Sequence, residues 1–350
     1  MNRKGNAEMD SERPQLLTFA ETSFERSWGG KRLADSLGRP VPPGKVIGAA
    51  WLVADHEQCR SVVDAGPWAG KTLRELMVEC PEYLLGTHVK PTPCGRFPLL
   101  LKLIDAGDML SVQVHPDDAI ALRLGEPDVG KTEMWHVLEA DPGAELVCGL
   151  APGTTRESFT AAVAEGRVEA CMTRFPAPPD TSVFVPAGTV HAIGGGILLA
   201  EIQQNSNLTY RVHDWNRVDD RGQPRELHLD KAMESISFHS SHAGPSVPTP
   251  FTAEGQHREL LSICRHFVAE RTLVSGPCLR QKGTGSFHLV VAVNDNITVF
   301  AGSADILAGS SVRVSLRRGA TVLVPGSVPE YTLEGKGAVL TYYVPKTAQE

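Results

Sequence analysis

Residues 110–137, LSVQVHPDDAIALRLGEPDVGKTEMWHV, are the stretch around which this 350-residue chain is organised. Gln113 and His115 are two positions apart, so on a β-strand both side chains leave the same face. Glu133 follows after residues 116–132, which are enough for an irregular loop and the entry to another strand. The stretch therefore predicts that an amide, an imidazole and a carboxylate meet at one metal ion.

His191 is the expected fourth ligand, because it follows a predicted strand that ends in Pro186-Ala-Gly188. Two imidazoles, a carboxylate and an amide oxygen suit a borderline divalent cation such as zinc. A single histidine is more often a surface or core residue than a ligand, so the prediction depends on the whole set. An amide oxygen is a weak zinc ligand, and Gln113 has the alternative role of hydrogen-bonding a metal-bound water.

Composition and charge limit the class of protein. The 41% hydrophobic and 21% charged residues are typical of a soluble globular chain, and the length is enough for two cores. The first ten residues hold no apolar run and no later stretch is long enough to span a bilayer, so a cytoplasmic location is expected. A net charge of −7 gives no general attraction to nucleic acid or membranes, so an anionic ligand needs a local cluster of Lys and Arg.

The seven cysteines are odd in number, scattered, and never form a CxxC pair. This pattern indicates reduced thiols that serve as packing residues.

Hydrophobic patterns predict strands over residues 46–53, 99–104, 110–114, 194–204 and 209–215, and later over 287–293, 297–301, 312–316, 321–324 and 339–344. Predicted helices are residues 73–78 with Thr72 as N-cap, a stretch opened by a capping box at Thr154 and Glu157, and residues 225–235. The Asp117 and Asp118 pair is expected to cap the turn after Pro116.

A sequence similarity within the chain predicts a second unit. Residues 321–330, TVLVPGSVPE, resemble residues 182–191, SVFVPAGTVH, but the histidine is missing. We expect two related β-barrel units: residues 15–238 with a helical insertion near 151–180 and the metal, a linker at 239–258, and a metal-free unit at 259–350.

Four motifs in order resemble the type I mannose-6-phosphate isomerases (phosphomannose isomerases) in their short bacterial form, over roughly residues 28–238. The motifs are Leu110-Ser-Val-Gln-Val-His-Pro-Asp-Asp118, Gly130-Lys-Thr-Glu133, Pro186-Ala-Gly-Thr-Val-His-Ala-Ile-Gly-Gly195 and Glu201-Ile-Gln-Gln-Asn-Ser-Asn-Leu-Thr-Tyr-Arg211.

The resemblance implies a mainly β cupin (jelly-roll) fold and an enzyme that interconverts mannose 6-phosphate and fructose 6-phosphate through an enediol, with one Zn²⁺ per chain. Carried over by motif, the metal ligands are Gln113, His115, Glu133 and His191. Arg211 matches the catalytic arginine.

Lys131 and Ser111 match residues that line the substrate pocket. Lys131 shares a strand face with Glu133, so it is also an expected catalytic residue. Trp28 precedes a glycine turn and is expected to form a wall of the pocket. The alternative roles are a solvated charge or surface ion pair for Lys131 and Arg211, and an ordinary strand residue for Ser111.

One departure concerns the substrate. Where the family often has a glutamate facing the sugar, this chain has Ala49. Two other hypotheses therefore stay open: a different cupin enzyme such as an iron-dependent oxygenase, and a metal-stabilised sugar-phosphate-binding protein without turnover. The expected partner is a small hexose phosphate, with the chain a monomer or homodimer.

Overall fold

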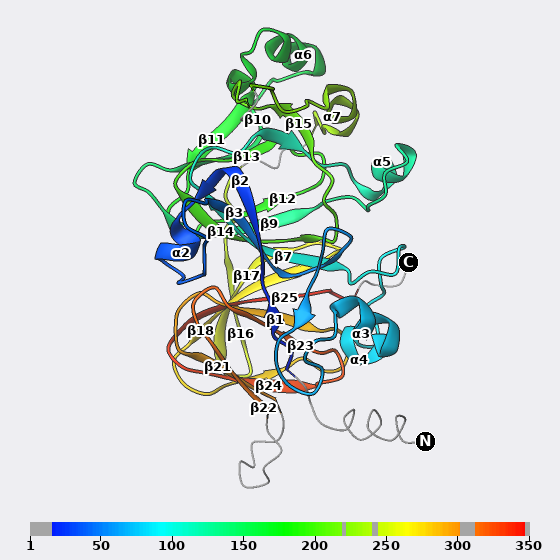
Figure 1. Ribbon diagram of the computed structural model, residues 1–350, viewed down its shortest axis with the longest axis vertical. Coiled ribbons are helices and arrows are strands. Elements are labelled where there is room, and N and C mark those ends of the chain that lie inside the picture. Colours follow the sequence, from blue (N-terminus) through cyan, green and yellow to red (C-terminus); the bar gives the residue numbers. More distant parts are fainter. Residues whose placement is uncertain (1–15, 219–221, 240–243, 302–311, 347–350) are drawn as a thin grey trace. The chain divides into compact units, whose positions relative to one another are not determined.

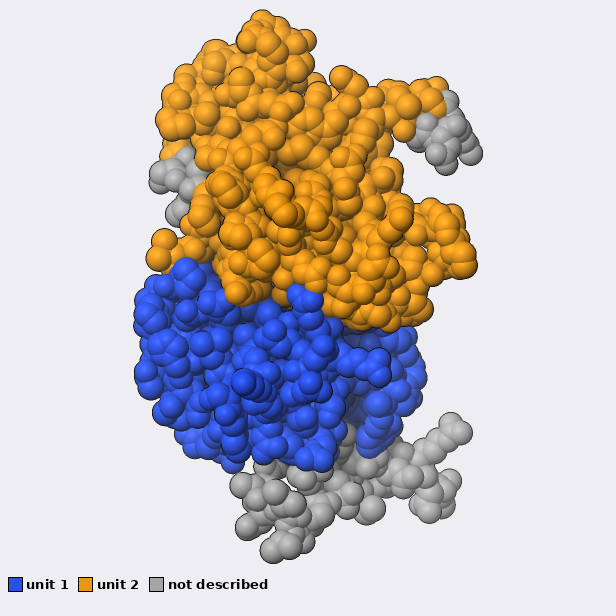
Figure 2. Space-filling model, turned by 90° about the vertical axis from the view of Figure 1, so that its left-hand side faces the viewer, with its two compact units in different colours: residues 1–21, 52–98, 248–350 blue, residues 22–51, 99–247 orange. Residues whose placement is uncertain are grey.

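The computed structural model describes residues 16–218, 222–239, 244–301 and 312–346. The chain divides into two compact units: unit 1 comprises residues 1–21, 52–98 and 248–350, and unit 2 comprises residues 22–51 and 99–247 (Figure 2). The patterns in the sequence did not predict that residues 52–98 group with the C-terminal part. The domain bounds expected from the sequence stay predictions, and two strands begin within the expected linker.

Unit 2 consists of two antiparallel sheets (Figure 1). The first sheet has the strand order β12-β9-β14-β7-β2-β3. Its strands are β2 (Thr22–Gly30), β3 (Ile47–Val53, ending in unit 1), β7 (Leu99–Ala106), β9 (Glu133–Ala140), β12 (Ser182–Val185) and β14 (Ile197–Gln204). The second sheet has the order β11-β10-β13-β8-β15. Its strands are β8 (Val112–Val114), β10 (Glu145–Leu150), β11 (Met172–Pro176), β13 (His191–Ile193) and β15 (Tyr210–His213).

Short helices cover one face of the second sheet. The helices of unit 2 are α2 (Arg32–Asp35), α5 (Asp118–Arg123), α6 (Arg156–Ala164), η1 (Val168–Cys171) and α7 (Leu229–Ser235). Val112 and Val114 pack into one cluster with Phe159 of α6 and Ala232 of α7. Because side chains alternate along a strand, Gln113 faces away from this cluster.

The start of α6 differs from the predicted capping box by one residue. Thr155 is the N-cap and exchanges hydrogen bonds with Ser158. Thr154 instead donates its backbone N–H to the Ala151 carbonyl in the preceding turn, at 3.1 Å. The expected cap at Thr154 and Glu157 is therefore wrong.

Unit 1 also has two antiparallel sheets, with orders β16-β17-β18-β25-β20-β23 and β19-β24-β21-β22. The strands of the first are β16 (Thr249–Ala253), β17 (Gln256–Ile263), β18 (Val268–Val274), β20 (His288–Ala292), β23 (Thr321–Val324) and β25 (Gly337–Tyr343). Those of the second are β19 (Cys278–Gln281), β21 (Ile297–Ala301), β22 (Val312–Leu316) and β24 (Glu330–Glu334).

Smaller elements complete unit 1. They are the strand pairs β1 (Phe19–Ala20) with β6 (Val62–Val63) and β4 (Asp55–His56) with β5 (Cys59–Arg60), and the helices α3 (Leu73–Glu79) and α4 (Pro81–Leu85). Thr72 is the N-cap of α3, as predicted, and it forms a capping box with Glu75.

Both units repeat one strand order. In unit 2, β12-β9-β14-β7 lie in one sheet and β11-β10-β13-β8 in the other. In unit 1, β23-β20-β25-β18 and β22-β21-β24-β19 occupy the same relative places, so β7 to β14 correspond one by one to β18 to β25. The predicted mainly β class with a second, related β-unit is confirmed. No helix in the described ranges is long and apolar enough to cross a bilayer.

Candidate metal centre and substrate pocket

Three predicted ligands meet inside unit 2. His115 follows the end of β8, while Glu133 and His191 are the first residues of β9 and β13. Their ligand atoms all lie within 4.8 Å of one another. Glu133 Oε2 is 3.4 Å from His115 Nε2, and Glu133 Oε1 is 3.5 Å from His191 Nε2. All three side chains are buried away from bulk solvent.

Both imidazoles are held in the neutral form that binds metals. Burial lowers the pKa of His115 to about 3, with Lys131 adding to the effect. Burial also lowers the pKa of His191. The Nδ1–H of His191 donates to the Thr189 carbonyl at 2.9 Å, because a carbonyl can only accept. His191 Nε2 is therefore a free lone pair, buried and without a hydrogen bond, as a metal ligand requires.

Glu133 supplies the negative charge. Burial alone would raise the pKa of this carboxyl, but the charge of Lys131 holds it well below its usual range. Lys131 Nζ lies 2.8 Å from Glu133 Oε2 and 3.0 Å from His115 Nε2. An ionised carboxylate beside two neutral imidazoles fits one divalent cation.

Gln113 pairs directly with His191 between β8 and β13. It is half-buried and lines the pocket described next. Its backbone position thus brings the amide beside one ligand of the group, while its role as a fourth ligand stays a prediction.

A pocket of about 330 Å³ lies in unit 2. It brings together the predicted residues Trp28, Ser111, Lys131 and Arg211, and Ala49 also lines it. Lys131 links the pocket to the metal centre, because it lines the first and contacts Glu133 of the second.

Lys102 of β7 and Glu201 of β14 line the same pocket but were missed as site residues. They are paired across the sheet, and Lys102 Nζ is 3.0 Å from Glu201 Oε1. Trp135 Nε1 donates to Glu201 Oε2 at 3.3 Å. Burial lowers the pKa of Lys102. A charge within a fully buried strand was the signal that could have identified both residues.

Three arginines give the pocket a positive wall: Arg26, Arg211 and Arg225. Arg211 Nη1 donates to the Glu226 carbonyl at 2.6 Å, while its Nε is buried without a hydrogen bond. Burial and the charge of Arg225 lower the pKa of both Arg26 and Arg211. Arg225 itself is paired with Asp214. Sequence reasoning identified only Arg211, because the other two lie outside the motifs.

The aspartates after Pro116 have structural roles. Asp117 caps α5, accepting from the Ile120 N–H at 2.8 Å. Asp118 accepts from the Gly130 N–H and from Gln204 Nε2, each at 2.9 Å. Asp117 therefore caps a helix rather than only a turn, and Asp118 joins its own motif to two of the others.

Comparisons with known proteins match most of the chain. The family model "Phosphomannose isomerase type I, catalytic domain" matches residues 16–134. A relative from Bacillus subtilis (strain 168), a probable mannose-6-phosphate isomerase named GmuF, is 36% identical over 321 residues, which cover 91% of this chain and 96% of the relative.

Solved structures agree with the fold. The crystal structure of the mannose 6-phosphate isomerase from Bacillus subtilis is 28% identical, with a TM-score of 0.83 over 93% of this chain and 99% of that chain. A zinc-bound mannose 6-phosphate isomerase is 15% identical and covers 94% of this chain and 99% of its own, with a TM-score of 0.74. The second likeness shows the fold alone, and the expected cupin-type fold is confirmed. Because a relative is 36% identical over 91% of this chain, the chain belongs to the type I mannose-6-phosphate isomerase family.

Proposed function

We propose that this protein interconverts mannose 6-phosphate and fructose 6-phosphate with one Zn²⁺ per chain. The observation that supports this proposal most is the buried group of His115, Glu133 and His191. Lys131 contacts Glu133 and also lines the neighbouring pocket, whose wall carries several cationic side chains. An aldose–ketose isomerase needs an electrophile, an acid–base group and a grip on phosphate, and the pocket offers residues for each.

The metal ligands would be Gln113, His115, Glu133 and His191. When bound, the zinc supplies a Lewis acid that stabilises negative charge on the sugar oxygens. The donor chemistry supports this assignment, because neutral imidazoles and an ionised carboxylate are the forms that zinc binds.

Proton transfer is assigned to Lys102 and Glu201. The reaction removes a proton from C2 of mannose 6-phosphate and returns one to C1, so one group must accept and donate near neutral pH. Burial lowers the pKa of Lys102, which favours the neutral amine that can accept a proton. Glu201, at 3.0 Å, holds the amine in place and accepts a hydrogen bond from Trp135.

The phosphate is assigned to Arg26, Arg211 and Arg225. Guanidinium groups bind phosphate oxygens in pairs, and Arg211 has a buried, unbonded Nε to offer. Lys131 keeps Glu133 ionised, while Ser111 and Trp28 shape the pocket for the sugar.

Ala49 keeps the hypothesis of sugar-phosphate binding without turnover open. Ala49 lines the pocket, so a glutamate at this position would add a carboxylate to its wall. Binding of mannose 6-phosphate without conversion would identify such a protein. An iron-dependent oxygenase would instead consume oxygen.

The experiment is a coupled assay that measures fructose 6-phosphate formed from mannose 6-phosphate by the purified protein. We expect conversion, its loss after chelation, and its return with zinc. In the same assay Lys102→Met is expected to lose about 100-fold or more in kcat. If zinc-loaded protein bound mannose 6-phosphate without converting it, the isomerase proposal would be contradicted. If Lys102→Met converted it at the parent rate, the acid–base role of Lys102 would be contradicted.

A cytoplasmic location is also a proposal. It is supported by the seven cysteines, all of which are free thiols, as in proteins of reducing compartments. Fractionation of the cells that make the protein tests it. That the chain is a monomer or a homodimer stays a prediction, which a measurement of its molar mass by light scattering tests.

A further inference from the structure

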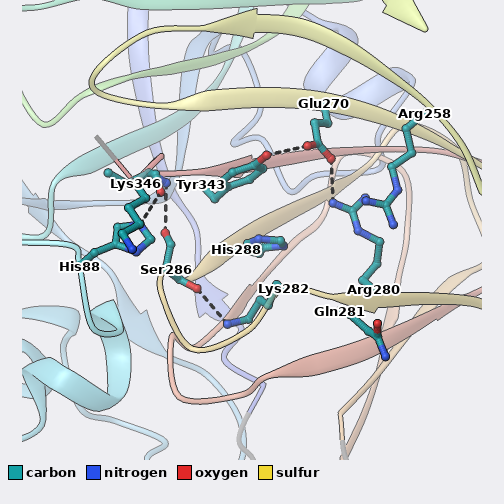
Figure 3. Close-up of a pocket in the computed structure, with 11 residues that line it drawn as sticks. His88, Arg258, Glu270, Arg280, Gln281, Lys282, Ser286, His288, Tyr343 and Lys346 are labelled. Carbon is teal, nitrogen blue, oxygen red and sulfur yellow. Dashed lines mark hydrogen bonds and ion pairs between the residues drawn. The ribbon is translucent and has the colours of Figure 1, made fainter. Parts of the chain in front are cut away.

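Unit 1 contains a second polar pocket, of about 210 Å³. Figure 3 shows Arg258, Arg280, Lys282, His288, Glu270 and Tyr343 around it. None of these residues lies in the pocket of unit 2, and the proposed isomerase chemistry does not use them.

The pocket occupies the place in the strand order that the metal centre has in unit 2. In unit 2, Glu133 of β9 pairs with Val185, the last residue of β12. In unit 1, His288 of β20 pairs with Val324, the last residue of β23. A proline follows each valine in the sequence. His288 therefore stands where the metal-site carboxylate stands.

The corresponding pair of strands in the other sheet carries different chemistry. His191 of β13 pairs with Gln113 of β8, whereas Tyr331 of β24, one residue after the position that the sequence similarity aligns with His191, pairs with Arg280 of β19. The ring nitrogen Nδ1 of His288 lies 3.0 Å from the Tyr331 hydroxyl. Groups that accept a metal ion are thus replaced by groups that donate hydrogen bonds or carry positive charge.

The corresponding position on β7 and β18 also changes the sign of its charge, from a lysine to a glutamate. Lys102 of β7 pairs with Glu201, and in unit 1 Glu270 of β18 pairs with Thr341. Glu270 accepts from Arg280 Nη2 at 2.8 Å and from the Tyr343 hydroxyl at 2.6 Å. Glu270 thus orients Arg280 and neutralises one positive charge.

The remaining cations outnumber the carboxylates. Arg258 is buried and ion-paired with Glu254, yet its Nε has no hydrogen bond in the described structure. Lys282 Nζ donates to three backbone carbonyls, at 2.9 to 3.2 Å, and has no carboxylate partner among the described residues. With Lys346 on the wall, Arg258, Arg280 and Lys282 face Glu270 as the lining carboxylate, while Glu254 pairs with Arg258 from outside the lining.

The electrostatic effect is visible on His288. Burial, followed by the charges of Arg280, Lys282 and Arg258, holds the pKa of His288 well below its usual range. Burial also lowers the pKa of Lys282 to about 7. The guanidinium groups of Arg258 and Arg280 lie next to each other (Figure 3), and burial followed by the charge of Arg280 lowers the pKa of Arg258.

We propose that this pocket binds the phosphate group of a small molecule, either inorganic phosphate or a phosphomonoester. A phosphate anion matches the net positive charge of the pocket, and the guanidinium groups match phosphate oxygens. The volume is below the roughly 300–1,000 Å³ of pockets for drug-sized ligands, so the occupant is small.

The test is calorimetric titration of the zinc-loaded full chain with inorganic phosphate and, separately, with glycerol 3-phosphate. The variants are Lys282→Met and Arg258→Gln, with Lys336→Met as a matched control because Lys336 is an exposed lysine of the same unit. Arg211→Ala removes one proposed phosphate contact of unit 2. A circular dichroism spectrum and a melting curve of each variant check its fold.

We expect a phosphate site that persists in Arg211→Ala and Lys336→Met and weakens at least tenfold in Lys282→Met and Arg258→Gln. Isomerase kcat and KM should stay at the parent values in Lys282→Met and Arg258→Gln. Preference for inorganic phosphate or for the monoester identifies the source of the group. Equal affinity in folded Lys282→Met, Arg258→Gln and the parent would overturn the proposal, even if the isomerase proposal holds.

Discussion

At His191, one backbone carbonyl determines what the imidazole can do. The Thr189 carbonyl fixes the proton on Nδ1, which leaves Nε2 as a lone pair directed at Glu133. We expect His191→Ala to lose zinc on dialysis and with it the isomerase activity, because removing a ligand costs more than the roughly 10- to 100-fold of a supporting residue. Metal analysis after dialysis measures this. His213→Ala is the control, since His213 lies outside the metal group, and equal zinc content in the two variants would remove His191 from the site.

Arg211 is expected to act on the substrate and not on the metal. It lines the pocket but is absent from the ligand group, so Arg211→Ala should keep one zinc and lose most turnover, by about 100-fold or more in kcat/KM. Steady-state kinetics with parallel metal analysis tests this expectation. Arg123→Ala, at an exposed ion pair with Glu234, is the matched control. Parent-like kinetics of Arg211→Ala would show that its assigned role is wrong.

Lys282 makes the stability of the protein depend on pH. Its pKa is about 7 in the folded protein, against roughly 10.4 in an unfolded chain. Between these values the unfolded chain binds more protons, so the free energy of unfolding should rise with pH from about 7 toward 10 because of this residue. Arg280, Glu270 and His288 face the same pocket.

Denaturant titrations of the parent and of Lys282→Met in phosphate-free buffer measure this effect. The parent should gain stability relative to the variant as the pH rises. Lys336→Met should follow the parent. Parallel curves for the parent and Lys282→Met would mean that Lys282 titrates normally.

At the scale of elements, the start of α6 distinguishes two adjacent threonines. Thr155 accepts from the Ser158 N–H and caps the helix, whereas the Thr154 N–H bonds in the turn before it. We expect Thr155→Ala to lower the free energy of unfolding by about 1 kcal/mol and Thr154→Ala to change it by less than about 0.5 kcal/mol. Urea denaturation compares the two. A larger loss in Thr154→Ala would restore the cap predicted from the sequence.

Long buried strands were the most predictable elements. The apolar run at 99–104 became β7, and the strand expected at 297–301 became β21 with the same bounds. β17, β18 and β19 were not predicted, because their buried charges Arg258, Glu270 and Arg280 interrupt the alternating pattern. Those same charges form the pocket of unit 1, so the failure of the pattern marks a site.

The metal group was predictable because its members lie in motifs with a fixed spacing. Lys102 and Glu201 were not predicted to line the substrate pocket, since they lie on separate strands and meet only through the β7–β14 register. Arg26 and Arg225 were missed because they lie outside the motifs. Sequence patterns show what a segment contains, while long-range strand pairing determines which segments meet.

At the scale of the whole molecule, one arrangement of eight strands occurs twice with opposite chemistry. In unit 2, the equivalent positions carry Gln113, Glu133 and His191, which accept a cation. The corresponding strands of unit 1 carry Arg280, His288 and Tyr331, which suit an anion. The repeated fold therefore positions both sites, and the side chains at a few paired positions decide the ligand of each.

Titration of metal-free protein with zinc, followed by the rate of fructose 6-phosphate formation, tests the central claim most directly. The claim is that one metal centre, formed by His115, Glu133 and His191, is required for isomerisation. We predict that activity rises linearly from zero and stops at one zinc per chain. Full activity in protein shown by elemental analysis to contain no metal would contradict the account.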